Sequence, residues 1–167
     1  MKAKILPVLI ALPVCLALIS FKASAEGVEG AKTTANIIVQ NAGSWTTLSN
    51  SVVVIPPGQT WHCIVTGSAD GSNPAPANSF DHQYRFTLSV DSANPAVDGA
   101  CERTLEFDNN FGVDDVSFED VNSTCPFKNI GPGAHIFRWQ ARKFNANDLN
   151  LTVQDNSHTV MCSRNLQ

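Results

Sequence analysis

The chain has 167 residues, with 15 acidic and 11 basic side chains, a net charge of −4 and 43% hydrophobic residues. That length and hydrophobic content are enough for one domain with a real core. An acidic chain without a cluster of basic residues is a poor partner for nucleic acid or anionic lipid, so we expect neither.

Residues 1–25 read as a secretory signal peptide of bacterial type. Two early lysines precede an apolar run over residues 5–21, and residues 23–25 (ASA) form the small-residue pattern that signal peptidase cleaves. A retained anchor helix is the alternative, but it usually needs about 20 apolar residues. We therefore expect export to the periplasm, the cell surface or the medium, with no membrane insertion after signal cleavage.

After the signal, residues 26–35 predict a flexible segment and residues 36–167 a single domain. Nine short segments of that domain have strand patterning: residues 36–40, 51–55, 61–66, 84–90, 103–107, 116–121, 135–141, 149–153 and 158–162. The clearest is YRFTLSV, which places Tyr84, Phe86 and Leu88 on one face. Because no helix is expected in this domain, the pattern predicts an all-β antiparallel sandwich of jelly-roll type.

Four cysteines remain after signal cleavage, and an even number in an exported chain predicts two disulfides. They are Cys63, Cys101, Cys125 and Cys162, and three connectivities are open. A zinc site of four cysteines is disfavoured because its ligands usually come in close pairs, and this sequence has none. We favour Cys101–Cys125 and Cys63–Cys162 on the basis of a predicted hairpin.

That hairpin joins the strand segments at 103–107 and 116–121. A register that sets Leu105 against Phe118 and Arg103 against Asp120 puts apolar residues on one face and brings opposite charges together. The same register brings the second and third of the four cysteines within reach of each other. A disulfide there would leave the first and last cysteines to join an early strand to the final one.

The stretch PPGQTWHCIV (residues 56–65) combines a turn with the start of a strand. Pro57-Gly58 is a strong turn former. Alternation after the turn predicts that Trp61 and Cys63 point into the sandwich and that His62 points outward. We therefore expect this histidine and cysteine to be parts of a disulfide-stapled strand, not a catalytic or metal pair.

Two turns of this kind, in VIPPGQTWHC and NIGPGAHIF, each precede a strand with a histidine near its start. Together with the strand count and the length, they resemble the jelly rolls of the tumour-necrosis-factor and complement-C1q superfamily over residues 36–164. The resemblance implies a sandwich that often trimerises and binds partners, and it carries over no catalytic residues.

One loop offers candidate metal ligands. Asp108, Asp114 and Asp115 could supply oxygen ligands to calcium, although the segment lacks the glycine and glutamate positions of an EF-hand. A solvated acidic turn is the alternative interpretation. The histidines predict no shared zinc or copper site, because His62 and His158 fall on opposite faces of the sheet once the neighbouring cysteines are bridged.

Trp45, in a polar loop-like stretch, is the best candidate for an exposed contact residue. No nucleophile-elbow or triad pattern stands out. We therefore expect a non-enzymatic protein that acts through binding or self-assembly, with a surface protein, a glycan or further copies of itself (a homo-oligomer such as a trimer) as partner. The first alternative is a carbohydrate- or ligand-binding module assisted by calcium, the one cofactor considered. The second is a hydrolase with scattered carboxylates.

Overall fold

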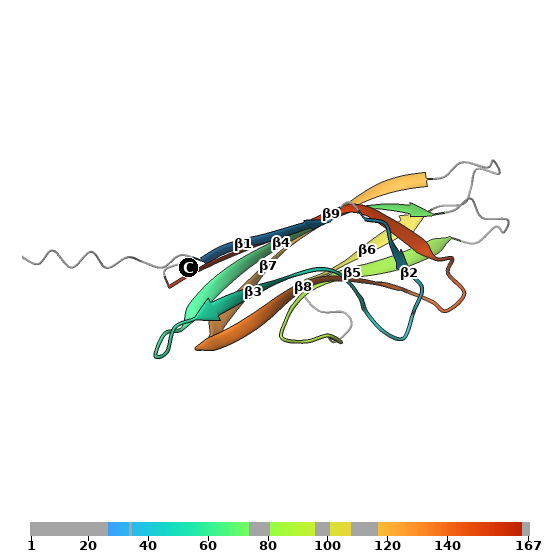
Figure 1. Cartoon of the computed structure of the whole chain (residues 1–167). Coiled ribbons are helices and arrows are strands. Elements are labelled where there is room, and N and C mark those ends of the chain that lie inside the picture. The colour runs from blue at the N-terminus through green and yellow to red at the C-terminus, as the bar shows by residue number, and fades with distance from the viewer. Residues whose placement is uncertain (1–26, 34, 74–80, 96–100, 108–116, 165–167) are drawn as a thin grey trace, which may run out of the picture.

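The computed structural model describes residues 27–33, 35–73, 81–95, 101–107 and 117–164, and it contains strands and no helix among them (Figure 1). The nine strands are β1 (Gly27–Thr33), β2 (Ile37–Val39), β3 (Thr46–Ile55), β4 (Trp61–Asn73), β5 (His82–Val90), β6 (Glu102–Phe107), β7 (Ser117–Ile130), β8 (Gly133–Lys143) and β9 (Leu151–Ser163). This confirms the all-β fold class predicted from the alternation of apolar and polar residues.

The two sheets of the molecule arise from one long antiparallel hairpin wound on itself. Along this hairpin β2 pairs with β9, β3 with β8, β4 with β7 and β5 with β6. Because the hairpin is wound on itself, β4 also pairs with β9 and β5 also pairs with β8. Sheet A therefore has the order β1-β9-β4-β7, with β2 also beside β9, and sheet B has the order β3-β8-β5-β6. This pairing is the jelly-roll arrangement, as predicted.

Alternating side chains from the two sheets fill the space between them. Tyr84, Phe86 and Leu88 of β5 are buried, as are Phe137 and Trp139 of β8, all on the faces that the sequence predicts. The rings of Phe86 and Trp139 lie 5.4 Å apart between centroids. Each large side chain buried in this way contributes about 1.5–3 kcal/mol to stability, so these positions dominate the core.

Trp139 reaches across the sandwich and lies directly on the backbone of Gly67 in β4. A Cβ atom at Gly67 would lie 2.6 Å from Cδ2 of the tryptophan ring, so the close packing of the sheets here depends on glycine. Next to Gly67 in sheet A, His158 of β9 meets Ser49 of β3 across the core, with 3.1 Å between Nδ1 and Oγ. Burial lowers the pKa of His158, which favours the neutral ring in this contact.

Both predicted disulfides are present. Cys63 and Cys162 are direct cross-strand partners in β4 and β9, with 4.1 Å between their Cα atoms. Cys101, just before β6, is bonded to Cys125 of β7. The first bridge staples neighbours within sheet A, and the second ties sheet B to sheet A.

The hairpin used to predict the second bridge is wrong. β6 pairs with β5 in sheet B, whereas β7 pairs with β4 in sheet A, so Arg103 and Asp120 belong to different sheets. The cysteines still meet because the two strands lie over each other at the same side of the sandwich, where the two sheets face one another. The predicted disulfide Cys101–Cys125 was correct, but the strand register from which we predicted it was wrong.

A second difference concerns the segment after the predicted signal peptide. Residues 27–33, within the segment predicted to be flexible, form β1, which runs antiparallel to β9 from Gly27 opposite Cys162 to Thr33 opposite Asn156. Glu29 and Gly30 on this strand are exposed. β1 is held to β9 by backbone hydrogen bonds, and such bonds do not require alternating apolar side chains. The sequence pattern therefore did not predict this strand.

The Pro-Gly turn before β4 is as predicted. The Gln59 amide donates to Pro56 O at 3.2 Å, and Gly58 has a φ of 73°, a left-handed conformation that glycine adopts without steric cost. The strand then begins at Trp61, which is buried, as is Cys63, while His62 between them lies on the other face and is half-buried. The histidine and cysteine of this stretch therefore belong to a stapled strand.

Candidate functional site

The predicted calcium ligands Asp108, Asp114 and Asp115 lie outside the described residues. Within the described part of the chain, no group of three or more His, Cys, Asp or Glu side chains is placed so that it could hold a metal ion. His158 points into the core and His62 away from it, so these two histidines lie on opposite faces of sheet A, as predicted.

Trp45 is half-buried, whereas the sequence suggested an exposed contact residue. Its Nε1 donates to Pro95 O at 3.1 Å, and the guanidinium of Arg142 lies 5.0 Å from a ring centroid. Gln140 of β8 also holds the segment at residues 91–95, since its Nε2 donates to Ala93 O at 2.8 Å. Trp45 thus anchors this segment over the outer face of sheet B, where it covers Gln140.

His135, near the start of β8, makes two polar contacts. Its Nδ1 lies 2.7 Å from Asp91 Oδ2 and its Nε2 lies 3.0 Å from Gly131 O, while the Ile136 amide donates to Asp91 Oδ1 at 2.8 Å. Partial burial by itself would raise the pKa of Asp91. The hydrogen bonds from His135 and Ile136, together with the charges of His135 and Arg138, outweigh that effect and lower it.

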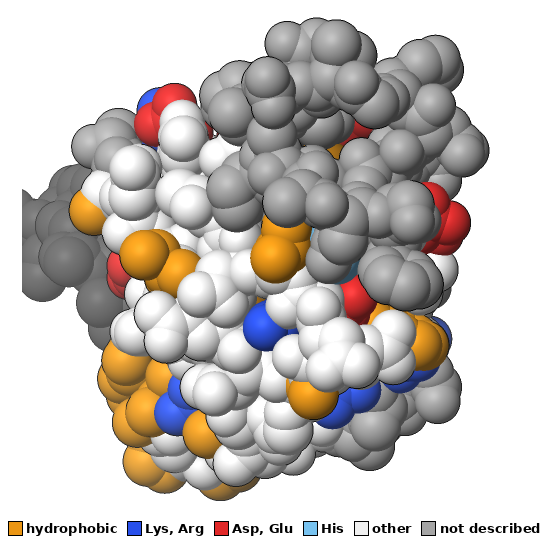
Figure 2. Space-filling model, turned by 90° about the vertical axis from the view of Figure 1, so that its right-hand side faces the viewer, with side chains coloured by type: hydrophobic (Ala, Val, Ile, Leu, Met, Phe, Trp, Pro, Cys, Tyr) orange, Lys and Arg blue, Asp and Glu red, His pale blue; other side chains and the backbone are white. Residues whose placement is uncertain are grey.

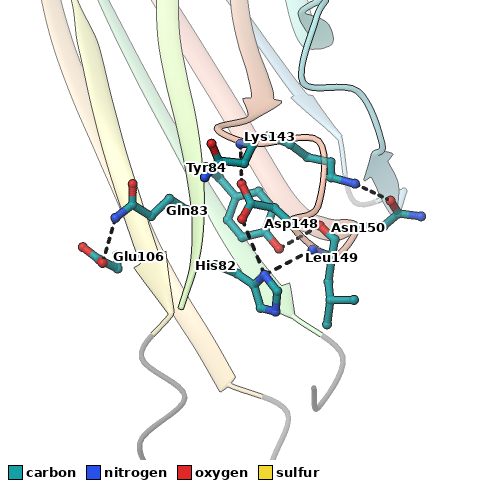
Figure 3. A network of polar contacts seen from close by, with 9 residues as sticks. His82, Gln83, Tyr84, Glu106, Lys143, Asp148, Leu149 and Asn150 are labelled. Carbon is teal, nitrogen blue, oxygen red and sulfur yellow. Dashed lines mark hydrogen bonds and ion pairs between the residues drawn. The ribbon is translucent and has the colours of Figure 1, made fainter. Parts of the chain in front are cut away.

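A polar network closes the end of the sandwich at the turn between β8 and β9 (Figure 3). The Leu149 amide donates to His82 Nδ1 at 3.3 Å, and the Tyr84 hydroxyl donates to Leu149 O at 2.9 Å. Asp148 accepts from the Asn145 amide at 2.6 Å, and its other oxygen lies 3.6 Å from His82 Nδ1. Two strand residues therefore hold the turn through its backbone.

The contacts in this network favour a structural role. His82 Nδ1 accepts the proton of the Leu149 amide, which holds the buried ring against the turn. Burial, together with the negative charge of Asp148, raises the pKa of Tyr84, which keeps its hydroxyl protonated. The raised pKa disfavours a tyrosinate at this position.

Two carboxyl groups meet on the outer face of sheet A. Asp70 of β4 lies opposite Asp120 of β7, and burial of Asp70, its hydrogen bond with Asp120 and the charges of Asp120 and Asp155 raise its pKa. Glycoside hydrolases hold their two carboxyl groups about 5–9.5 Å apart, with the substrate between them. Carboxyl groups that bond directly to each other do not match that geometry.

Figure 2 shows the surface from one end of the sandwich, where hydrophobic side chains lie among scattered charged ones. On the outer face of sheet B, two valines of β3 stand out: Val52 is 50% exposed and Val54 is 66% exposed. In the register of β3 and β8 they lie beside Ile136 and Ala134, respectively. We refer to these four residues as the valine face.

The sequence contains a pattern that indicates the valine face, but the alternation of apolar and polar residues alone does not show it. Residues 51–55 (SVVVI) were recognised as a strand, and Val53 and Ile55 are buried as that strand requires. The three consecutive valines also put apolar side chains on the opposite side, which points to a strand covered on both faces. By contrast, the contact of His82 with Asp148 depends on the sheet topology and has no local signal.

Neither a scan against protein-family models nor a search of curated proteins matches this chain. Within the described residues, no helix is long and apolar enough to cross a membrane. The fold and the geometry of the faces are therefore the basis for assigning a function.

Proposed function

We propose that the chain is an exported, non-enzymatic protein that self-associates through the valine face. The observation that carries this proposal is the exposure of Val52 and Val54 on a strand at the edge of a sheet. Large aliphatic side chains at 50% and 66% exposure, with further apolar side chains beside them, favour an interaction surface.

The backbone of β3 supports the same conclusion. β3 pairs with β8 on one side, and among the described residues no strand pairs with it on the other. Exposed edge strands usually carry charges, a proline or a bulge that prevents edge-to-edge pairing. β3 has a bulge between Thr47 and Ser49, but its C-terminal part, from Asn50 to Ile55, has no charged residue and no proline.

Charge explains why a second copy would meet at this face. The chain is acidic, with a net charge of −4, so two copies repel each other over most orientations. The four residues of the valine face carry no charge, although the Asp91 carboxylate accepts from the Ile136 amide beside them, so approach through this face reduces that repulsion. The resemblance to the tumour-necrosis-factor and C1q superfamily likewise favours an oligomer, with a trimer as its usual form.

Light scattering coupled to gel filtration tests this proposal. The oxidised protein should elute as an oligomer, and Val54→Lys should convert it to a monomer because the lysine places a charge in the contact. Ile38→Lys is the matched control: Ile38 is also a β-branched residue at 50% exposure, but it lies on β2 in the other sheet. A monomeric wild type, or an unchanged oligomer in Val54→Lys, would contradict the proposal.

A further inference from the structure

The outer face of sheet A carries an ordered grid of uncharged side chains. Three rows cross the strands β9, β4 and β7 in register, and their members are Met161, Ile64 and Pro126 in the first row, Thr159, Thr66 and Thr124 in the second, and Ser157, Ser68 and Asn122 in the third. The alternate residues of the same strands, such as Val65 and Cys125, are buried in the core. We call this grid the hydroxyl face.

The hydroxyl face has regular spacing and limited side-chain freedom. Neighbouring strands lie about 4.8 Å apart and alternate residues about 6.7 Å apart along a strand, so the rows form a nearly rectangular grid. The three threonines are exposed and β-branched, which restricts their rotation. In the next row, Ser68 and Ser157 share a hydrogen bond of 2.8 Å between their hydroxyls.

The charges of this sheet lie around the grid and not within it. Asp70 and Asp120 occupy the next positions beyond the serine row, and Lys32 of β1 lies opposite Ser157 at the side. The nine grid positions themselves hold no ionisable side chain. A partner that carries charge would find no opposite charge on the nine grid positions, and the charges around the grid are of both signs: two aspartates at one edge and Lys32 at the side.

We propose that the hydroxyl face binds a neutral polysaccharide. A sugar ring presents an apolar face of C–H groups and a rim of hydroxyls, and the grid offers one apolar row beside two rows that donate and accept hydrogen bonds. A polymer repeats these features along its length, as the grid repeats its rows. Self-association does not cover the hydroxyl face, because the valine face lies on the other sheet.

The proposal is tested by sedimentation of the purified, oxidised protein with insoluble cellulose, chitin and mannan, and with polygalacturonate gel as an acidic polymer. Wild type should sediment with at least one of the three neutral polymers and not with the acidic gel. Thr66→Glu, at the centre of the grid, should weaken that binding by about tenfold or more, because the carboxylate loses water without gaining a partner. Thr66→Val, which keeps the shape and removes the hydroxyl, should weaken it by a smaller factor.

Thr104→Glu is the matched control, since Thr104 is an exposed strand threonine on β6 of the other sheet. It should bind as wild type does, and circular dichroism should show that all three variants are folded. The proposal is overturned if wild type sediments with none of the neutral polymers, if it binds the acidic gel equally well, or if Thr66→Glu and Thr104→Glu bind alike.

Discussion

Replacement of Gly67 by alanine tests the packing between the sheets. The added Cβ atom would lie 2.6, 2.8 and 3.0 Å from three atoms of the Trp139 ring, all well inside van der Waals contact. The ring cannot move away easily, because Phe86 packs against it at 5.4 Å and its side chain is fully buried. Overpacking of this kind costs about 1–3 kcal/mol, and a rigid indole places the cost near the upper end.

One effect opposes that cost. Alanine lowers the conformational entropy of the unfolded chain, which stabilises the folded state by about 0.5–1 kcal/mol relative to glycine in a strand. The net loss should therefore be about 2 kcal/mol, which corresponds to a fall in Tm of about 5–10 °C for a domain of this size. Urea denaturation followed by tryptophan fluorescence, with the disulfides intact, measures this difference directly.

Gly43→Ala is the matched control, since nothing lies within 4 Å of a Cβ atom at that position. It should change the free energy of unfolding by no more than about 0.5 kcal/mol. If Gly67→Ala proves as stable as wild type, the sheets do not pack through Trp139 in the way described, and the core must be arranged differently.

Two further predictions concern redox state and pH. Reduction should lower Tm substantially, because it opens loops of 24 and 99 residues. In the chain-entropy model these two losses amount to about 3.4 and about 4.7 kcal/mol, respectively. Four free thiols in the freshly isolated protein would contradict this prediction. The lowered pKa of Asp91 means that its contribution to stability is present above the pKa of an unfolded aspartate and is lost as pH falls through the folded-state value. Asp91→Asn should therefore flatten the acid limb of a plot of stability against pH, and an unchanged limb would show that the contact with His135 adds nothing.

How far the sequence predicts this fold depends on which contacts are local. The alternation of apolar and polar residues identified the inward residues of β5 and β8, because this pattern lies within each strand and does not depend on which strand pairs with it. Pairing is different: Leu105 and Phe118 fit together in a plausible register, yet β6 pairs with β5, since apolar and charged residues on short strands suit several partners. β1 was missed because its contacts are made by the backbone.

The candidate faces illustrate the same limit. Each row of the hydroxyl face takes one residue from each of three strands, and those strands are far apart in the chain: Thr66, Thr124 and Thr159 become neighbours only when β4 lies between β7 and β9. No spacing rule in the sequence joins them. The disulfide Cys63–Cys162 came closest to revealing this arrangement, since it fixes β4 beside β9 and with it the alignment of every residue on those two strands.

The positions of the two proposed faces have a consequence for binding strength. The outer faces of two packed sheets point in opposite directions, so copies that associate through Val52 and Val54 on sheet B leave the grid around Thr66 on sheet A free. An assembly then presents several grids at once, and a repeating polymer can occupy them together. Weak binding at each grid would become strong overall, by a factor of about 10²–10⁴ in favourable geometry. Val54→Lys should therefore reduce polysaccharide binding without any change in the hydroxyl face. Equal binding by the monomeric variant and the wild type would show that the grid acts alone.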